Sequence, residues 1–511
     1  MVLANFHQWS TSDPLSKGLM PSWVGELDAN RIAAYNLYEQ VYWNVPEAFQ
    51  IIQRGSDSKP IYIPAAKKIV ETLHRYLAKG ISFVPDQNAP ENNEAYATLV
   101  SLLRRERFKS KFSSAKRFGI IRGDWLLHMY ADPERQDGSR ISLEFIDPAG
   151  YFPIYNPDNV DEIIGCHLVA HVELEDGMFI ERLTYRKETE AGGPSPITRT
   201  KELYEVDEWG GPGVEQGSPV RTVLPAETLP APIDQLPVYH IRNFEQDGTV
   251  WGSSELRGFE VLIGALNQGA TDEELTLALE GLGVYATTAG KPINDETGEE
   301  EAWNLGPARV VEHPDGTDFK RVTGVSSVAP YQDHLGYIER WIDIATGTPD
   351  IAAGTVDVQV AESGVALAMK MAPMLDRAEE KDETIKAVLD NWLFDLRSWY
   401  IAYEPTLRAP MESALWVVSF GSKLPVNREQ KFAELMTLAK ADPPVVPMTW
   451  VRGELSKIGY EFADDTEVMD AILTERTIFA QIAMDVTGAR MDQELGGNED
   501  LATQDEPGDA E

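Results

Sequence analysis

The residue types that most often bind metals occur in this chain without the spacing that a metal site requires. The single cysteine, Cys166, is followed by His167 and His171 in a stretch that reads as a strand. Because neighbouring residues of a strand point to opposite faces, the two histidines would share one face and Cys166 would point to the other. Ordinary strand packing is therefore favoured over a metal site.

Motifs of nucleotide and hydrolytic chemistry are absent from the sequence. Nothing matches Gly-x-x-x-x-Gly-Lys-Ser/Thr, so any energy for transport would come from another protein. Neither Gly-x-Ser-x-Gly nor His-Glu-x-x-His occurs. Carboxylates are so numerous that neighbours such as Asp272, Glu273 and Glu274 favour a charged surface over acid–base catalysis. We expect a protein that is not an enzyme and needs no cofactor or metal, with a carboxylate-dependent hydrolase as the alternative.

The overall composition describes a folded and strongly acidic protein. The 511 residues include 45 Lys and Arg against 83 Asp and Glu, a formal charge of −38, and 43 % are hydrophobic. This length and apolar content support several packed units, and one cysteine excludes a disulfide scaffold. So much negative charge disfavours a protein that grips DNA over most of its surface. We also expect no export signal and no membrane span, since no run of about 18 apolar residues occurs.

The first half of the chain changes from helical to strand-like spacing. Apolar residues recur at three- and four-residue intervals and predict three amphipathic helices before residue 118, near Ile32–Tyr38, Ile69–Leu77 and Tyr96–Leu103. From Gly119 to about Tyr239, short alternating runs punctuated by Pro and Gly predict an antiparallel β-rich unit.

Two helices flanking an insertion are predicted next. The first runs from about Ser254 to Leu282, with Ser253 or Ser254 as its cap, and the second from about Tyr331 to Thr346. Between them, a Gly-, Asp- and Glu-rich stretch contains strand-like pieces at 308–312 and 319–322, which predicts a small α/β insertion.

A mobile loop and a long helix are predicted after these elements. Gly and Pro breakers at 347–364 favour the loop, and Pro373 should kink the helix, in which Trp392 shares an apolar face with Leu389 and Leu396. A strand at 414–420, helices between 428 and 483 and an acidic, disordered tail complete an α+β chain.

Charge is unevenly spread over these elements. The helix predicted at 254–282 carries six carboxylates and one arginine, and a ring of such helices would present a negative wall that DNA slides past without adhering. A basic run is the exception, and it favours a solvated helix face or salt bridges over contact with DNA: Arg104, Arg105, Arg107, Lys109, Lys111, Lys116 and Arg117.

The order of these elements resembles the portal proteins of tailed double-stranded DNA phages, of the type common in long-tailed phages. The similar pieces lie between about residues 31 and 485, and they include Lys67–Gly80, Phe118–Trp125, Ile146–Tyr155, Leu236–Ile241, Trp251–Leu256, Leu262–Asn267 and Glu362–Lys370. Their joint order carries the resemblance, because no single piece is specific.

The resemblance implies a ring subunit with a helical and antiparallel β wing, a two-helix stem, a small α/β clip, a long kinked tunnel helix and a helical crown. Carried onto this chain, the regions are the wing at 1–252 and 406–426, stem helices at 253–282 and 326–347, the clip at 283–325, the tunnel loop at 348–362, the tunnel helix at 363–405, the crown at 427–485 and the acidic tail at 486–511.

The resemblance also implies a DNA channel and its lining. The tunnel-loop candidates are Val356, Asp357, Val358, Gln359 and Val360, in a stretch without Lys or Arg from Thr348 to Glu362. The stem candidates are Glu260, Asp272, Glu273 and Glu280.

The implied role is a dodecameric ring at one capsid vertex, through which DNA is packaged and ejected. Its implied partners are further copies of itself, double-stranded DNA, terminase, a head-completion or adaptor protein, and the major capsid or scaffolding protein. The protein would be made in the host cytoplasm and end in the virion, with no membrane involved. A capsid or head–tail scaffold protein without a DNA channel remains a further alternative.

Overall fold

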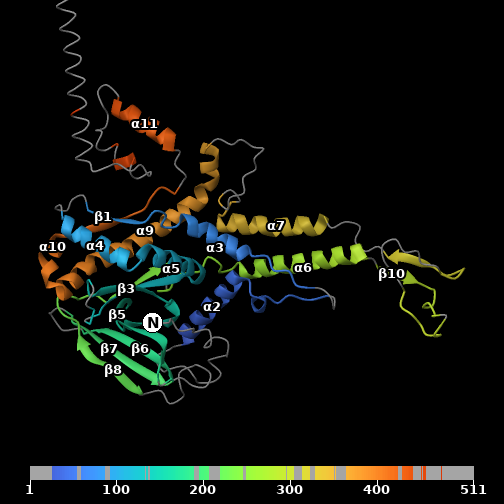
Figure 1. The fold of residues 1–511 in the computed structure, drawn as a ribbon, viewed down its shortest axis with the longest axis horizontal. Coiled ribbons are helices and arrows are strands. Elements are labelled where there is room, and N and C mark those ends of the chain that lie inside the picture. The colour runs from blue at the N-terminus through green and yellow to red at the C-terminus, as the bar shows by residue number, and fades with distance from the viewer. Residues whose placement is uncertain are drawn as a thin grey trace, which may run out of the picture. The chain divides into compact units, whose positions relative to one another are not determined.

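A computed structural model of the chain (Figure 1) forms two compact units, Met1–Lys423 and Leu424–Glu511, which are described separately. The structure describes residues 26–54, 59–86, 92–132, 134–135, 138–175, 177–188, 195–205, 219–245, 249–282, 284–294, 296–303, 313–322, 329–349, 352, 364–423, 428–440, 451, 453–455 and 474.

Four α-helices open the described part of the first unit, where the sequence predicted three. They are α2 (Glu26–Trp43), α3 (Ala65–Tyr76), α4 (Asn93–Arg105) and α5 (Phe108–Arg122). Asn92 caps α4 by accepting a hydrogen bond from the Ala95 N–H at 3.0 Å. The sequence analysis missed α5 as a separate helix because Lys and Ser fill most of its first half. Phe108 and Phe112 nevertheless anchor it in the core.

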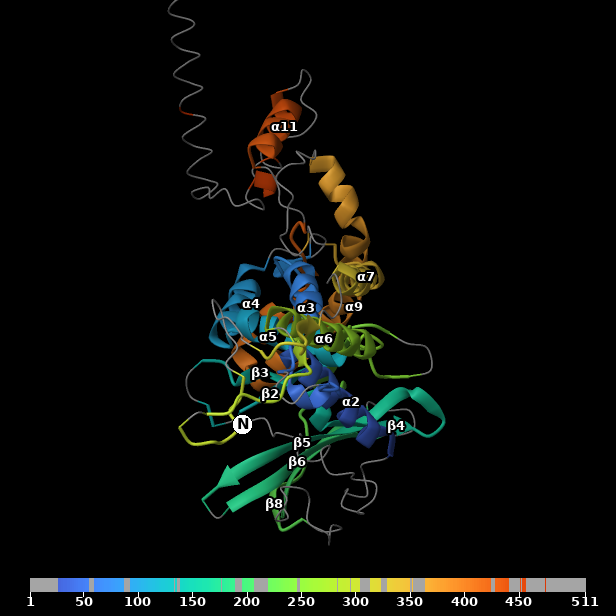
Figure 2. The same ribbon diagram turned by 90° about the vertical axis from the view of Figure 1, so that its right-hand side faces the viewer.

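The β-rich unit is confirmed and consists of antiparallel sheets. Strands β2 (Asp124–Ala131), β3 (Ile141–Ile146) and β9 (Val238–Arg242) form a three-stranded sheet in the order β3-β2-β9. A five-stranded sheet runs in sequence order through β4 (Tyr151–Asn156), β5 (Asn159–Leu174), β6 (Gly177–Lys187), β7 (Ile197–Glu205) and β8 (Arg221–Thr228). Helices α3, α4 and α5 lie on one side of the three-stranded sheet and the larger sheet on the other (Figures 1 and 2).

A glycine contact ties the start of β2 to the segment that precedes the next long helix. Gly123 ends α5 with φ +105°, and a Cβ there would meet the Gly252 carbonyl oxygen at 2.7 Å. Glycine is therefore required for both the backbone conformation and the close approach. This contact fixes residues 252–254 against the end of α5.

The two helices predicted around the insertion are present as α6 (Glu260–Leu282) and α7 (Ala329–Thr346). The expected start of the first helix at Ser254 is wrong, because the Ser254 hydroxyl donates to the Ile121 carbonyl and accepts from the Leu256 N–H at 3.0 Å. These bonds hold a turn instead of a helix cap. Farther along, a Cβ on Gly269 of α6 would lie 2.7 Å from Leu335 of α7, so the two helices pack closely there.

Between α6 and α7 the described residues contain an antiparallel hairpin of β10 (Val284–Thr287) and β11 (Phe319–Val322). The predicted strand at 319–322 is confirmed, and the one at 308–312 lies outside the described residues. We expected helix and strand in 283–325. The described residues of this segment contain strands and no helix.

The long helix is α9 (Gly364–Tyr403), which contains Pro373 and supplies the centre of the core. Trp392 is fully buried, as its apolar spacing predicted, and stacks on Phe108 with the ring centroids 5.5 Å apart. After the short helix α10 (Arg408–Ser413), strand β12 (Trp416–Ser419) pairs with β1 (Ser82–Pro85). Residues more than 300 positions apart thus share one core.

The second unit is described in part. Helix α11 (Arg428–Lys440) contributes Leu435 to a small buried cluster with Val451 and Leu455. The rest of the predicted crown helices and the acidic tail lie outside the described residues. No helix in the described part of the chain is long and apolar enough to span a membrane.

Candidate functional site at the junction of α6, α7 and α9

The predicted tunnel-loop residues, Val356, Asp357, Val358, Gln359 and Val360, lie outside the described residues. The structure does describe the segment that leads into them. Gly347 ends α7 with φ +64°, and the Thr348 N–H donates to the Asp343 carbonyl at 3.1 Å. The start of the predicted loop is therefore anchored to the last turn of α7.

The acidic stem candidates on α6 are partly engaged within the same subunit. Glu260 accepts a hydrogen bond from the Gly258 N–H at 2.7 Å, and Asp272 pairs with Arg54 at 3.1 Å. Glu273 accepts from the Gln332 side chain of α7 at 3.2 Å. The side chain of Glu280 lies outside the described part of the structure.

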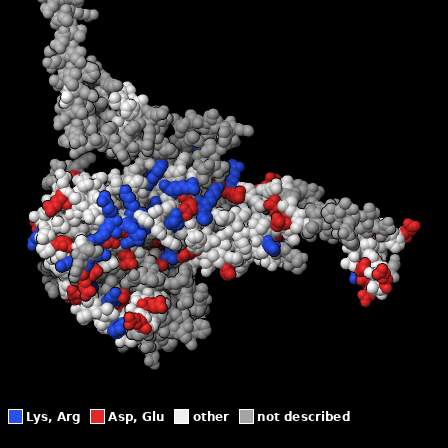
Figure 3. All heavy atoms as spheres, in the orientation of Figure 1, with Lys and Arg blue, Asp and Glu red and all other residues white. Residues whose placement is uncertain are grey.

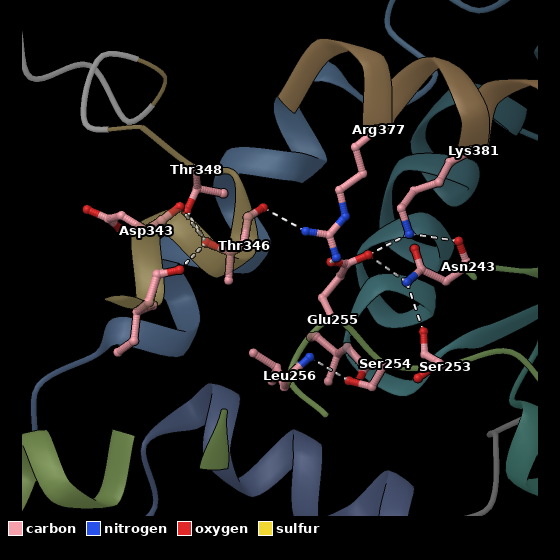
Figure 4. A network of polar contacts seen from close by, with 12 residues as sticks. Asn243, Ser253, Ser254, Glu255, Leu256, Asp343, Thr346, Thr348, Arg377 and Lys381 are labelled. Atoms are coloured by element: carbon pink, nitrogen blue, oxygen red, sulfur yellow. Dashed lines mark hydrogen bonds and ion pairs between the residues drawn. The ribbon is translucent and has the colours of Figure 1, made fainter. Parts of the chain in front are cut away.

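A buried ion-pair network lies where α6, α7 and α9 come together (Figure 4). Its centre is Glu255, which is 3 % exposed and sits five residues before α6. One carboxylate oxygen accepts from Lys381 Nζ at 2.5 Å and from Asn243 Nδ2 at 2.9 Å, and the other pairs with Arg377. Since Lys381 is only 4 % exposed, the carboxylate and the ammonium group neutralise each other inside the protein.

Arg377 connects this carboxylate to the end of α7. Its Nη1 donates to the Thr346 carbonyl at 2.6 Å, in the last turn of the helix. A cation is favourable there because helix C-termini carry unpaired carbonyls and a partial negative charge. Arg377 therefore joins the residues before α6, the end of α7 and the N-terminal half of α9.

The end of α7 is held from two further sides. The hydroxyl of Thr346 hydrogen-bonds that of Thr348 at 2.6 Å, and Asp343 pairs with Lys68 of α3 at 2.9 Å. A Cβ on Gly347 would lie 4.0 Å from the backbone of Pro373, at the point where α9 lacks one N–H donor. The proline of α9 and the positive-φ glycine after α7 thus lie close to each other.

The electrostatics of the junction favour an ionised Glu255. Burial alone would raise the pKa of this carboxyl, but the charges of Lys381 and Arg377 and the hydrogen bonds from Lys381 and Asn243 outweigh it, so its pKa lies below the usual value. An ionised Glu255 thus connects the segment before α6 to α9.

The sequence reading did not find this junction. Glu255 was assigned to the acidic channel wall, and Arg377 and Lys381 were not singled out. Their spacing of four residues places both cations on the same face of one helix. This spacing is the one feature of the nearby sequence that indicates a shared partner. Their partners, Asn243, Glu255 and Thr346, are distant in sequence.

The basic run is divided between internal contacts and exposed positions. Lys116 is buried and donates to the Leu77 carbonyl at 2.6 Å, and Arg117 pairs with Glu71 at 2.8 Å. Arg105 and Lys111 both pair with Glu106. The preference for salt bridges is correct for Arg105, Lys111 and Arg117, while Arg104, Arg107 and Lys109 are exposed.

The expectation of strand packing at Cys166 agrees with the structure. Cys166 is buried, and burial raises the pKa of its thiol to about 12, so the thiolate that binds metals is disfavoured. His167 Nδ1 lies 2.9 Å from the Thr184 hydroxyl. Among the described residues, no group of three side chains is arranged to hold a metal ion.

An apolar stripe is exposed on α7, beside the face that carries the buried residues Ile338 and Ile342. Tyr337, Trp341 and Ile344 are 59 %, 48 % and 59 % exposed. Their spacing of four and three residues places them on one face of the helix. Val261 and Leu277 of α6 are also exposed.

Comparison with known proteins gives one family match that spans most of the chain. The model of the family described as phage portal protein, SPP1 Gp6-like, matches residues 57–443. A search of curated protein sequences finds no match.

Similar solved structures come from gene transfer agent (GTA) particles. One is described as the virion of the native particle, with 14 % identity, coverage of 84 % of this chain and 95 % of that chain, and a TM-score of 0.43. A chain of the native particle's neck, computed with C12 symmetry, has 14 % identity, coverage of 89 % and 100 %, and a TM-score of 0.44. A chain of the empty particle's neck, computed with C6 symmetry, has 13 % identity, coverage of 88 % and 98 %, and a TM-score of 0.46.

Proposed function

Because the chain belongs to the SPP1 Gp6-like family of phage portal proteins, we propose that it forms a closed ring at one vertex of a phage capsid, with a central channel for DNA. The family is a structural one, and the protein would act as part of the virion. The ring would be a dodecamer through which DNA is packaged and later ejected. It would also be the platform on which terminase and a head-completion or adaptor protein dock, and it would contact the major capsid or scaffolding protein.

The elements of the first unit fit the regions expected of such a ring subunit. We assign α6 and α7 to the stem, the β10–β11 hairpin to the clip and α9 to the tunnel helix. The N-terminal helices, the two larger sheets and β12 would form the wing, and α11 would belong to the crown. The junction around Glu255 and Arg377 would then connect wing, stem and tunnel helix.

The observation that carries the ring, beyond family membership, is the apolar stripe of α7. Large aromatic and aliphatic side chains on one helix face are unfavourable in water and commonly mark an interface with another protein. In a ring each subunit uses two different surfaces, so one surface of a copy meets the other surface of the next copy. We therefore infer that Tyr337, Trp341 and Ile344 pack against a different surface of the neighbouring subunit.

Replacing Trp341 by glutamate tests this assembly. A carboxylate in an apolar interface would be desolvated, so Trp341→Glu should yield monomers or open fragments at micromolar concentration. Trp43→Glu is the matched control, since Trp43 is equally an exposed tryptophan, on α2. Mass photometry of both variants would show whether only Trp341→Glu loses the ring. Rings of unchanged mass in Trp341→Glu would contradict the proposed interface.

A change in the predicted tunnel loop tests the channel separately. Asp357→Lys would turn one repulsive charge per subunit into an attractive one facing DNA phosphates. We expect rings of normal mass with a lower yield of packaged DNA. Unchanged packaging would place Asp357 away from the DNA, and loss of the ring would make the segment a structural contact.

A further inference from the structure

The turn between α4 and α5 collects positive charge around one buried carboxylate. Glu106, which is 9 % exposed, pairs with Arg105 at 3.1 Å, with Lys111 at 3.3 Å and with Arg135 at 3.5 Å. Three cations thus share a single negative charge. The excess positive charge remains at the surface, because 27 %, 37 % and 28 % of the side chains of Arg105, Lys111 and Arg135 are exposed.

Three further cations that pair with no described residue flank this cluster. Arg104 lies in the last turn of α4, Arg107 lies in the turn between the helices with φ +50°, and Lys109 lies in the first turn of α5. All three are exposed, and none forms an ion pair with a described residue. We call the six cations Arg104, Arg105, Arg107, Lys109, Lys111 and Arg135 the basic corner. With Asp132 and Glu134 beside Arg135 and Glu144 near Lys111 counted, the six cations face four described carboxylates, Glu106 included.

The basic corner is part of a wider positive face. Residues 65–122 carry twelve Lys and Arg against five Asp and Glu, whereas the whole chain carries 45 against 83. Figure 3 shows Lys and Arg gathered over α3, α4 and α5, with few Asp or Glu among them. On a protein of net charge −38, this face is where a polyanion meets the least repulsion.

The same face lacks the features of a protein-binding hot spot. Among the described residues of 65–122, no large hydrophobic side chain is exposed. Protein interfaces are centred on aromatic and apolar anchors, whereas surfaces that bind the DNA backbone are polar and rich in Arg and Lys. Composition therefore favours phosphate groups over an acidic protein surface.

We propose that the basic corner binds the phosphate backbone of double-stranded DNA, as a contact surface separate from the channel. The inference rests on the proposed function, because a portal ring is exposed to packaged DNA. Contacts from Lys and Arg to phosphates are independent of sequence and release counterions. The corner would thus hold DNA weakly and in a salt-dependent manner, while the acidic remainder of the surface repels it.

The test measures binding of a fluorescently labelled, random-sequence DNA duplex to the full chain across a range of salt concentrations. The variant Arg104→Ala/Arg107→Ala/Lys109→Ala removes the three unpaired cations. Lys291→Ala/Lys320→Ala/Arg408→Ala is the matched control, since it removes three exposed cations elsewhere. The plot of log K against log salt has a negative slope, and each lost phosphate contact makes that slope less steep by about 0.9. In the first variant only, we expect the affinity for DNA to fall at least tenfold at low salt. The salt dependence of that variant should be less steep by about 2–3.

Two results would overturn the proposal. One is a corner variant that binds DNA as the control variant does. The other is displacement of the duplex from the wild-type protein by polyglutamate at equal charge concentration, which would assign the corner to an acidic protein. The mass of the assembly, measured on the same samples, separates this inference from the proposed ring. Intact rings that do not bind DNA would contradict DNA binding by the basic corner and would leave the proposed ring unaffected.

Discussion

Replacing Glu255 by glutamine should destabilise the protein far more than the same change at an exposed glutamate. The substitution preserves the shape of the side chain and removes its charge. Lys381, which is 4 % exposed, then loses its counter-ion in an environment where water cannot replace it. Removal of one partner from a buried ion pair costs about 3–5 kcal/mol. Arg377 loses less, because it is 30 % exposed and keeps its bond to the Thr346 carbonyl.

The matched control is Glu412→Gln. Glu412 pairs with Arg408 one turn away on α10, and both side chains are more than half exposed. Exposed pairs of this kind contribute about 0–1 kcal/mol. Urea unfolding followed by tryptophan fluorescence, at one fixed protein concentration, gives both changes in unfolding free energy.

A double variant distinguishes the ion pair from general damage to the fold. Adding Lys381→Met to Glu255→Gln removes the unpaired buried cation, so the double variant should be more stable than the sum of the two single changes predicts. Coupling of about 0.5–3 kcal/mol is typical of residues in direct contact. Equal effects of Glu255→Gln and Glu412→Gln, or additive effects in the double variant, would refute the reasoning.

Three other predictions concern the core, the pH dependence and the tail. Trp392→Ala should cost about 3–5 kcal/mol in urea unfolding, because it leaves a cavity beside Phe108, and a loss under about 1 kcal/mol would contradict the packing. Burial and the nearby charges of Lys201 and Arg199 lower the pKa of His128 to about 3, so the unfolded chain takes up this proton first and stability should fall as the pH drops below about 6.5. His128→Gln should reduce the drop in unfolding midpoint between pH 7 and pH 5, and an equal drop would exclude His128 as a source. Deletion of 493–511, which contains seven carboxylates and no Lys or Arg, should leave the melting temperature and the ring unchanged, and loss of either would mean that this segment is needed for folding or assembly.

Elements with a regular apolar spacing could be predicted from the sequence. The helix predicted from Tyr331 to Thr346 is α7, and the buried face of Trp392 follows from its spacing with Leu389 and Leu396. Alternation between Gly119 and Tyr239 likewise indicated antiparallel strands. In each of these cases one repeating face packs against the core, and periodicity reports such faces directly.

Elements set by distant contacts could not be predicted in this way. The start of α6 was placed six residues too early because the Ser254 side chain bonds to Ile121, far away in the sequence. Glu255 looked like one more surface carboxylate, since its partners Arg377 and Lys381 are more than 120 residues away. Which residues of the basic run form ion pairs and which stay exposed also depends on the folded structure. Glu106 pairs with Arg105 and Lys111, and the sequence alone does not show which neighbours it reaches.

The mass of the native assembly tests the central claim most directly. Native mass spectrometry of the full chain, at micromolar concentration and near-physiological salt, should give a closed ring, which we expect to contain twelve copies of the 56.9 kDa chain. A sample that consists only of monomers under these conditions would contradict the proposed portal ring.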